Sequence, residues 1–199
     1  MIRVEDVSDG GAMRSLYYSI IHPTVTAIAV HEPLAIPHIH RIVKEFYPLM
    51  ILETGTSWGG MSLILHECNP HAILHSWDIE SSRKPNKSLF NHNVNFHLES
   101  ILNPNKLLTE LCKRDKRKLL YLDNGNKALE AQLYVPLLNA GDMFAVHDWN
   151  KEISFCDVSN LIEDFEPIEH ELFEENNWST RFWKRKSPSQ GQASSREKE

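Results

Sequence analysis

Cysteine is scarce in this chain. Among 199 residues only Cys68, Cys112 and Cys156 occur, they lie far apart, and no two of them form a C-x-x-C pair. An odd number of widely spaced cysteines predicts neither a disulfide framework nor a structural zinc site. We therefore expect three ordinary thiols in a reducing compartment.

Membrane signals and an excess of positive charge are also lacking. No basic segment followed by an apolar stretch opens the chain, which predicts no signal peptide, and no apolar run approaches the ~20 residues of a membrane-spanning helix. The formal net charge is -6, whereas proteins that bind DNA or RNA concentrate positive charge. We expect a cytoplasmic protein with neither a membrane nor a nucleic acid as partner.

Five short apolar runs fill the middle of the chain. Several are almost continuously hydrophobic, as is typical of strands buried on both faces of a parallel sheet. The predicted strands are Leu49–Glu53, Ile73–Asp78, Val94–Glu99, Leu119–Asp123 and Met143–Asp148, and the predicted helices between them are Gly60–Glu67, Pro85–Asn91, Asn105–Lys113 and Ala128–Leu138. This alternation predicts an α/β fold with a Rossmann-like, doubly wound, mostly parallel sheet.

Different patterns flank this region. Residues 1–45 are expected to be helical and irregular, with one amphipathic helix at Ile36–Phe46 directly before the first strand. After the fifth strand we predict a helix at Ser159–Phe165. Two antiparallel strands should follow at Ile168–Phe173 and Ser179–Lys184, joined by a turn at Glu175–Asn177. Residues 1–186 are thus expected to form a single domain, and the polar residues 187–199 a disordered tail.

Each of the five predicted parallel strands ends in an acid. These acids are Glu53, Asp78, Glu99, Asp123 and Asp148. Because ligands of open α/β sheets bind outside the carboxyl ends of the strands, the five carboxylates should line one edge of the sheet. Acids that merely cap the following helices are the alternative. Carboxylates repel the pyrophosphate of a dinucleotide and suit a ligand with ribose hydroxyls, an amine and a positive sulfonium, such as S-adenosylmethionine.

A glycine-rich turn follows the first predicted strand, with the sequence Glu53-Thr-Gly55-Thr56-Ser-Trp-Gly59-Gly60. The spacing is G-x-x-x-G-G and differs from the G-x-G-x-x-G of dinucleotide-binding folds. Glycines allow a tight turn and a close approach of the backbone to a ligand. A plain turn from strand to helix is the alternative for Gly55 and Gly59.

The pattern E-x-G-x-x-x-G resembles motif I of class I S-adenosylmethionine-dependent methyltransferases, and the resemblance runs from about His38 to Lys184. It implies that Asp78 binds the ribose hydroxyls and that Glu99 and Ser100 form the loop beside the adenine. The complete set of cofactor-binding residues that we predict is Glu53, Gly55, Thr56, Gly59, Asp78, Glu99, Ser100 and Asp123.

A second resemblance narrows the reaction. The segments Leu122-Asp-Asn-Gly-Asn-Lys127, Tyr134 to Asp142 and Val146-His-Asp148 are similar to a layout in sugar, macrolide and cephalosporin-pathway O-methyltransferases. The resemblance implies transfer of a methyl group to a hydroxyl of a small molecule or sugar. Many of these enzymes depend on magnesium, which would make Asp123 and Asp148 metal ligands. The chain departs from the layout at Asn124, Asn126, Asp142 and His147.

Two mechanisms therefore stay open. In one, Asp123 and Asp148 bind Mg²⁺, which lowers the pKa of the acceptor hydroxyl. In the other, His147 is the general base because histidine titrates near neutrality, and Asp123 or Asp148 orients it. Other readings of the chain are a non-catalytic cofactor-binding scaffold and a nicotinamide-dependent oxidoreductase. The oligomeric state is open, with a homo-oligomer as one alternative.

Two further groups of residues are interpreted as ordinary. Lys127 is expected to be solvated, which is the usual state of lysine. His22, His31, His38 and His40 are scattered near the N-terminus and lack the i, i+4 spacing of helical metal ligands, so no metal site is predicted there.

Overall fold

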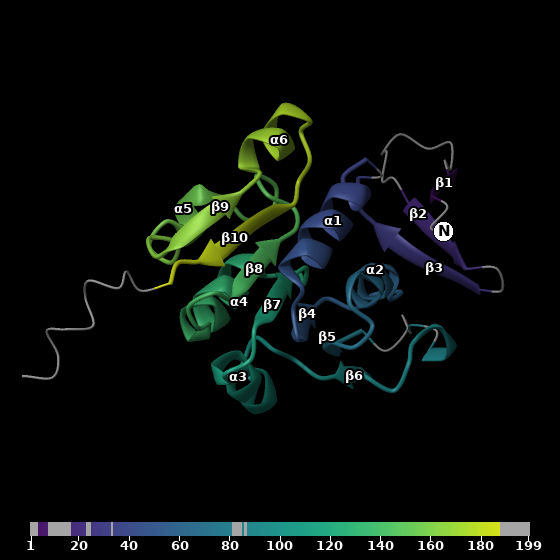
Figure 1. Cartoon of the computed structure of the whole chain (residues 1–199), viewed down its shortest axis with the longest axis horizontal. Helices are drawn as coiled ribbons and strands as arrows, with labels where there is room; N and C mark the ends of the chain where they lie inside the picture. Colours follow the sequence, from purple (N-terminus) through teal and green to yellow (C-terminus); the bar gives the residue numbers. More distant parts are fainter. Residues whose placement is uncertain are drawn as a thin grey trace, which may run out of the picture.

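A seven-stranded sheet forms the centre of the computed structural model, which describes residues 4–7, 17–22, 25–32, 34–80, 85 and 87–187 (Figure 1). Its strands are β4 (Met50–Thr54), β5 (Ile73–Asp78), β6 (Val94–Leu98), β7 (Lys118–Leu122), β8 (Met143–Val146), β9 (Phe165–Ile168) and β10 (Arg181–Arg185). The spatial order is β6-β5-β4-β7-β8-β10-β9, in which β10 runs antiparallel to both of its neighbours. The predicted doubly wound, mostly parallel sheet with an antiparallel C-terminal pair is confirmed.

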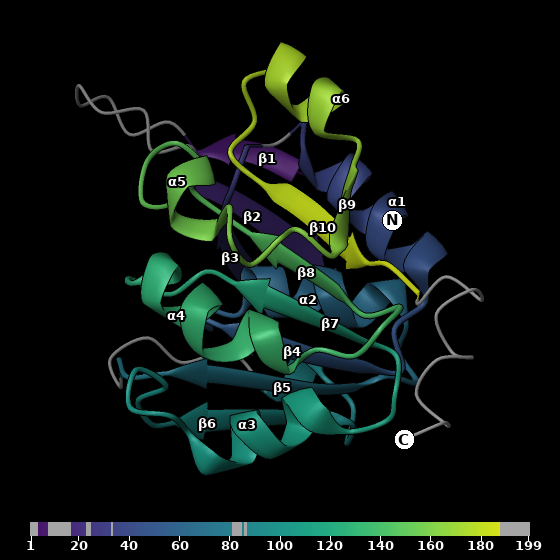
Figure 2. The same ribbon diagram turned by 90° about the vertical axis from the view of Figure 1, so that its left-hand side faces the viewer.

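Helices cover both faces of this sheet (Figure 2). The helices are α1 (Ile36–Phe46), α2 (Gly60–Cys68), α3 (Lys106–Lys113), α4 (Lys127–Tyr134), α5 (Phe155–Val158) and α6 (His170–Glu175), with 3₁₀ turns η1 (Lys87–Leu89) and η2 (Val135–Leu137). Side chains of α1 and α2 pack on one face, and side chains of α3 and α4 pack on the other. Among the described residues no helix is long and apolar enough to cross a membrane.

The central strands are mostly apolar because both of their faces are buried. Ile51 and Leu119 point into the core that contains α1 and α2. Their neighbours Met50, Leu52 and Leu120 point into the core that contains α3 and α4. Because successive side chains point into one core and then the other, apolar residues follow one another along these strands and do not alternate with polar ones. All three cysteines are free, as predicted, and Cys68 and Cys112 lie in these two cores.

The N-terminal segment differs from the prediction. It contains a second, antiparallel sheet of β1 (Val4–Val7), β2 (Tyr17–His22) and β3 (Val25–Val30), of which β3 lies beside α2 (Figure 1). The expected helical and irregular character is therefore wrong for these strands, whereas helix Ile36–Phe46 is confirmed. The run Val25–Val30 combines β-branched residues with alanine, and β-branched residues favour strands.

The segment after β8 also differs. The helix predicted at Ser159–Phe165 is wrong: α5 ends at Val158, and Phe165 begins β9. The strand predicted at Ile168–Phe173 is also misplaced, because β9 ends at Ile168 and helix α6 connects it to β10. Phe173, the last residue of the predicted strand, packs from α6 against Trp178.

Two predicted elements were only partly found. The helix expected at Pro85–Asn91 is reduced, in the described part of the chain, to the 3₁₀ turn η1. Residues 188–199 of the predicted tail lie outside the described residues.

Candidate active site

A pocket of about 450 Å³ opens at the carboxyl edge of the main sheet, where β4, β5, β7 and β8 end. Such a volume is in the range of small-molecule sites. The pocket is lined by His31, Gly55, Thr56, Ser57, Gly60, Met61, Asp78, Ile79, Glu80, Asp123, Asn124, Gly125, His147 and Asp148.

The turn after β4 is built around Gly55. Its φ is +90°, and a Cβ at this position would lie 2.2 Å from the backbone oxygen of Asp123. Only glycine allows the loops that follow β4 and β7 to approach so closely. The next residue, Thr56, directs its hydroxyl to that of Ser76 at 2.5 Å. The structure thus places Gly55 and Thr56 on the pocket wall.

Asp78 closes β5 and faces the same pocket. One of its carboxylate oxygens accepts a hydrogen bond from the backbone N–H of Ser57 at 2.6 Å, and the other accepts one from Glu80 N–H at 2.8 Å. These bonds fix the carboxylate between the glycine turn and the β5 loop. A carboxylate oxygen has two lone pairs, so Asp78 keeps the capacity to accept further hydrogen bonds from ligand hydroxyls.

Four of the predicted cofactor residues do not line the pocket: Glu53, Gly59, Glu99 and Ser100. Glu53 is fully buried within β4, where the hydroxyls of Ser62 and Ser76 donate to it, and burial raises its pKa to about 8. Glu99 follows edge strand β6 and accepts from the Trp77 indole at 3.3 Å. Of the five strand-end acids, the pocket therefore collects Asp78, Asp123 and Asp148, and the prediction that all five line the edge is wrong for buried Glu53.

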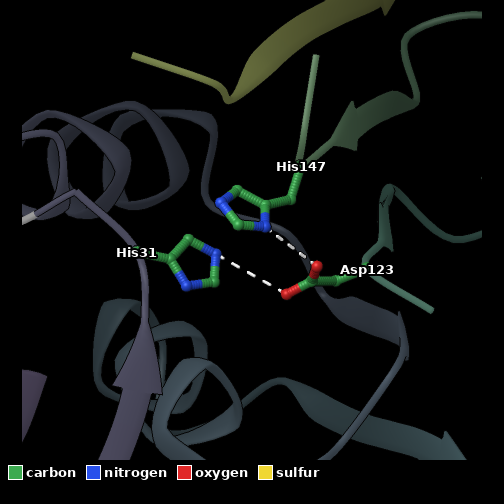
Figure 3. A group of neighbouring side chains, drawn as sticks. All are labelled: His31, Asp123 and His147. Carbon is green, nitrogen blue, oxygen red and sulfur yellow. Dashed lines mark hydrogen bonds and ion pairs between the residues drawn. The ribbon is translucent and has the colours of Figure 1, made fainter. Parts of the chain in front are cut away.

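Two histidines converge on Asp123 (Figure 3). His147 Nδ1 lies 3.0 Å from one carboxylate oxygen of Asp123, and His31 Nε2 lies 3.6 Å from the other. The two imidazole rings stack with their centroids 3.9 Å apart. His31 Nε2 also lies 2.9 Å from the hydroxyl of buried Tyr121. Residues from before α1, from the end of β7 and from the end of β8 thus form one cluster.

The two rings carry different charges. Burial, together with the charge of His147, lowers the pKa of His31 to about 3, so this ring is neutral. Burial also favours neutral His147, but the carboxylates of Asp123 and Asp148 outweigh it and raise the pKa of His147 to about 10. The Nε2 atom of His147 is engaged as well, 3.3 Å from the hydroxyl of Ser179. His147 is therefore already protonated at neutral pH, and the expectation of a base that titrates near neutrality is wrong.

Asp148 is held in an uncommon backbone conformation with φ at +57°. Aspartate tolerates this left-handed region better than most residues. Its carboxylate lies 3.0 Å from Lys127 Nζ and 3.3 Å from His147 Nδ1. Burial opposes ionisation, but hydrogen bonding and charge from His147, together with Lys127, hold the pKa of Asp148 well below its usual range.

Lys127 is buried, with 2% of its surface exposed, so the expectation of a solvated lysine is wrong. Its ammonium group lies 2.7 Å from Glu152, 3.0 Å from Asp148 and 3.7 Å from Asp123. Burial lowers the pKa of Lys127, but the three carboxylates outweigh burial and raise it, so the group stays charged.

We tested whether these residues suit a metal ion. One ligand atom each from His31, Asp123 and His147 lies within 4.8 Å of the others, which is close enough to hold an ion. Mg²⁺ prefers oxygen ligands, however, and two of these three ligands are imidazoles. The rings are only 23° from parallel, so their in-plane lone pairs do not converge on one point. Asp123 and Asp148, the predicted metal ligands, already form ion pairs with Lys127. The arrangement therefore does not fit Mg²⁺.

The sequence reasoning missed His31, Glu32 and Ser179. Glu32 accepts from the Ser179 hydroxyl at 2.5 Å and lies 4.0 Å from His147 Nε2. A signal for two of them exists in the sequence: Ala29-Val-His-Glu32 and Ala145-Val-His-Asp148 are nearly the same tetrapeptide. In each of them the histidine directly follows a strand, and the structure brings the two histidines into contact.

Neither a protein-family model nor a curated protein sequence matches the chain. Among solved structures, an apo structure of CmcI has a TM-score of 0.60 at 16% identity, over 80% of this chain and 74% of that one. The O-methyltransferase TomG from Streptomyces achromogenes has a TM-score of 0.54 at 15% identity, over 80% and 82%.

A third similar structure is an S-adenosylmethionine-dependent O-methyltransferase from Thermotoga maritima, with a TM-score of 0.58 at 12% identity over 83% of this chain and 69% of that one. Identities this low establish the fold alone. The chain thus shares the class I fold of S-adenosylmethionine-dependent O-methyltransferases.

Proposed function

We propose that the chain transfers the methyl group of S-adenosylmethionine to a hydroxyl of a small molecule or sugar. The observation that carries this proposal is one pocket lined by Asp78, the Gly55 turn and Asp123. The fold adds support, since TomG was solved with S-adenosylmethionine and MycE, at a TM-score of 0.54, with Mg and S-adenosylhomocysteine. This chain covers only 49% of MycE, so we do not assign the methyl acceptor of MycE to this chain.

The charge of the pocket favours this cofactor over a nicotinamide dinucleotide. Asp78, Glu80, Asp123 and Asp148 line the pocket, and none of the lining residues is a lysine or an arginine. Carboxylates attract a positive sulfonium and repel a pyrophosphate. Among the described lining residues the positive group is His147, which already pairs with Asp123 and Asp148, so it is not available to the pyrophosphate that the oxidoreductase alternative requires.

Asp123 is the residue that we assign to the acceptor hydroxyl. S-adenosylmethionine supplies an electrophilic methyl group, so a C–O bond forms while the C–S bond breaks. The hydroxyl becomes strongly acidic as the C–O bond forms, and a nearby carboxylate suffices to take its proton. Asp123 lines the pocket, and its side chain is 16% exposed. Charged His147 donates to Asp123 and orients it, which makes His147 a positioning residue rather than the base.

Calorimetric titration with S-adenosylmethionine and S-adenosylhomocysteine tests the cofactor. We expect micromolar binding by the natural protein and a loss of at least about tenfold in Asp78→Asn, which removes a charged hydrogen-bond acceptor worth ~1.5–3 kcal/mol. Asp115→Asn is the matched control, because Asp115 is exposed and precedes β7 at the opposite edge of the sheet. Binding of NAD in place of both compounds would overturn the proposal.

Turnover separates the enzyme from a scaffold. Asp123→Asn should retain cofactor binding within a fewfold while methyl transfer to a panel of hydroxyl compounds falls by ~10²-fold or more. Transfer that survives this substitution would remove Asp123 from the reaction. Tight cofactor binding without transfer to any acceptor would favour the non-catalytic reading.

A further inference from the structure

The ammonium group of Lys127 occupies the space between three carboxylates, of which Asp123 and Asp148 line the pocket. Asp148 and Glu152 are within 3.0 Å of Nζ, and Asp123 is 3.7 Å away. Asp123 and Asp148 are also the two residues to which the sequence assigned a magnesium ion. A fixed cation of the protein therefore lies where a divalent cation would have to bind.

The placement of Lys127 is costly by itself. Lys127 is the first residue of α4, where the helix dipole disfavours a positive charge. Its side chain is also almost completely removed from water, which lysine rarely accepts without partners. Only the surrounding carboxylates offset both effects, so the lysine and the three acids form one interdependent unit.

We propose that Lys127 replaces the divalent cation of metal-dependent relatives of this fold and makes the site independent of metal. Its charge holds Asp123 and Asp148 in place at the pocket, so Lys127 is a positioning residue. A compact divalent ion would need several oxygen ligands at ~2.0–2.1 Å, and Nζ already binds one carboxylate oxygen each of Asp148 and Glu152. The exclusion of a divalent cation by Lys127 does not depend on methyl transfer. Only its consequence for turnover rests on the proposed function.

Thermal unfolding of the natural protein is the first test. We expect the same Tm in EDTA, in MgCl₂ and in MnCl₂ at matched ionic strength. A Tm that rises with either metal and falls with EDTA would overturn the proposal. This measurement needs neither a variant nor a known acceptor.

Removal of the lysine charge is the second test. Lys127→Met leaves three carboxylates facing one another, so we expect a lower Tm than in the natural protein. MgCl₂ or MnCl₂ should then raise it by several degrees, because a bound ion stabilises the folded state. Calorimetry should show Mn²⁺ binding to this variant and none to the natural protein. A lower Tm that no divalent ion restores would mean a purely structural lysine and would contradict the proposal.

Two variants serve as controls. Lys127→Arg keeps the charge and should show no response to divalent ions. Lys151→Met removes a second lysine of the same cluster, 3.8 Å from Asp148 but 61% exposed, and should also show none. A metal response in Lys151→Met would mean that the net charge of the cluster, and not the position of Lys127, excludes the ion. If S-adenosylmethionine fails to bind while these results hold, the proposed function fails and the cation assignment stands.

Discussion

Glu53 is a carboxyl group that the protein keeps from ionising. It is fully buried in β4, and the hydroxyls of Ser62 and Ser76 both donate to one of its oxygens. Burial raises its pKa to about 8, whereas an exposed glutamate titrates near ~4.3. Glu53 therefore belongs to the packing between β4, β5 and α2, although it stands in the motif that predicted a cofactor contact.

This pKa predicts how stability depends on pH. Between about pH 4.3 and 8 the folded protein keeps a proton on Glu53 that the unfolded chain has lost, so the free energy of unfolding falls as pH rises. The contribution of one group is at most about 1.4 kcal/mol per pH unit. Glu53→Gln resembles the protonated acid and should remove this slope. The variant should be as stable as the natural protein near pH 5 and more stable above pH 8.

Urea unfolding from pH 5 to 8.5 measures the difference between the two proteins. Glu171→Gln is the control, because Glu171 is exposed on α6 and its removal should leave the slope unchanged. Parallel profiles for Glu53→Gln and the natural protein would mean that Glu53 ionises normally.

Prediction at the residue scale succeeded for acids at or beyond the last residue of a strand and failed for Glu53, which lies before the last residue of β4. Asp78, Asp123 and Asp148 all face the pocket, as the rule for open α/β sheets requires. In the register of the sheet Glu53 lies beside Ser76 and Tyr121, two residues before the level of Asp78 and Asp123, so it shares their face but lies inside the sheet. A shift of two residues along a strand thus changes the role of a side chain.

At the scale of elements, the turn between β4 and α2 depends on a single glycine. Gly55→Ala would force a Cβ to within 2.2 Å of the Asp123 backbone oxygen at a φ of +90°. We expect a loss of more than about 2 kcal/mol in the free energy of unfolding, together with weaker cofactor binding. Gly125→Ala is the matched control, since no atom lies within 4 Å of its Cβ, and should change stability by less than about 0.5 kcal/mol. Denaturant unfolding of both variants checks this, and equal stabilities would contradict it.

Strands could be predicted from the sequence where both of their faces are covered by the rest of the protein. Strand β5 was predicted with the bounds that it has, Ile73–Asp78, because Ile73, Leu74 and Trp77 make it mostly apolar and Asp78 ends it. Edge strand β9 is short and contains Pro167, so its pattern is weak.

The chain departs from the O-methyltransferase layout at Asp142 for a structural reason. The carboxylate of Asp142 pairs with fully buried Lys118 at 2.5 Å, a contact between distant residues that local sequence patterns do not reveal.

At the scale of the whole molecule, the candidate site joins distant parts of the chain. His31 contacts Tyr121, and Glu32 binds Ser179, which is 147 residues away in the sequence. Local periodicity does not encode which distant segments of the chain meet. His31 was therefore interpreted as one of several scattered histidines without a role in the site. The sheet topology was predictable because alternating strands and helices form βαβ units, whose parallel strands bring three of the acids to one edge.

Hydrogen exchange tests this arrangement of the whole molecule. The strand-end loops 55–60, 78–80 and 123–125 include most of the lining of the pocket, whereas turns 114–117 and 139–142 precede β7 and β8 at the opposite edge. Saturation with S-adenosylhomocysteine should slow exchange in the first group, because a bound ligand suppresses local opening of the segments that it contacts. The second group should exchange at an unchanged rate, and the Asp78→Asn variant should show no protection. Protection of the opposite edge alone would place the ligand elsewhere, and binding without protection at any of the three loops would separate this pocket from the cofactor.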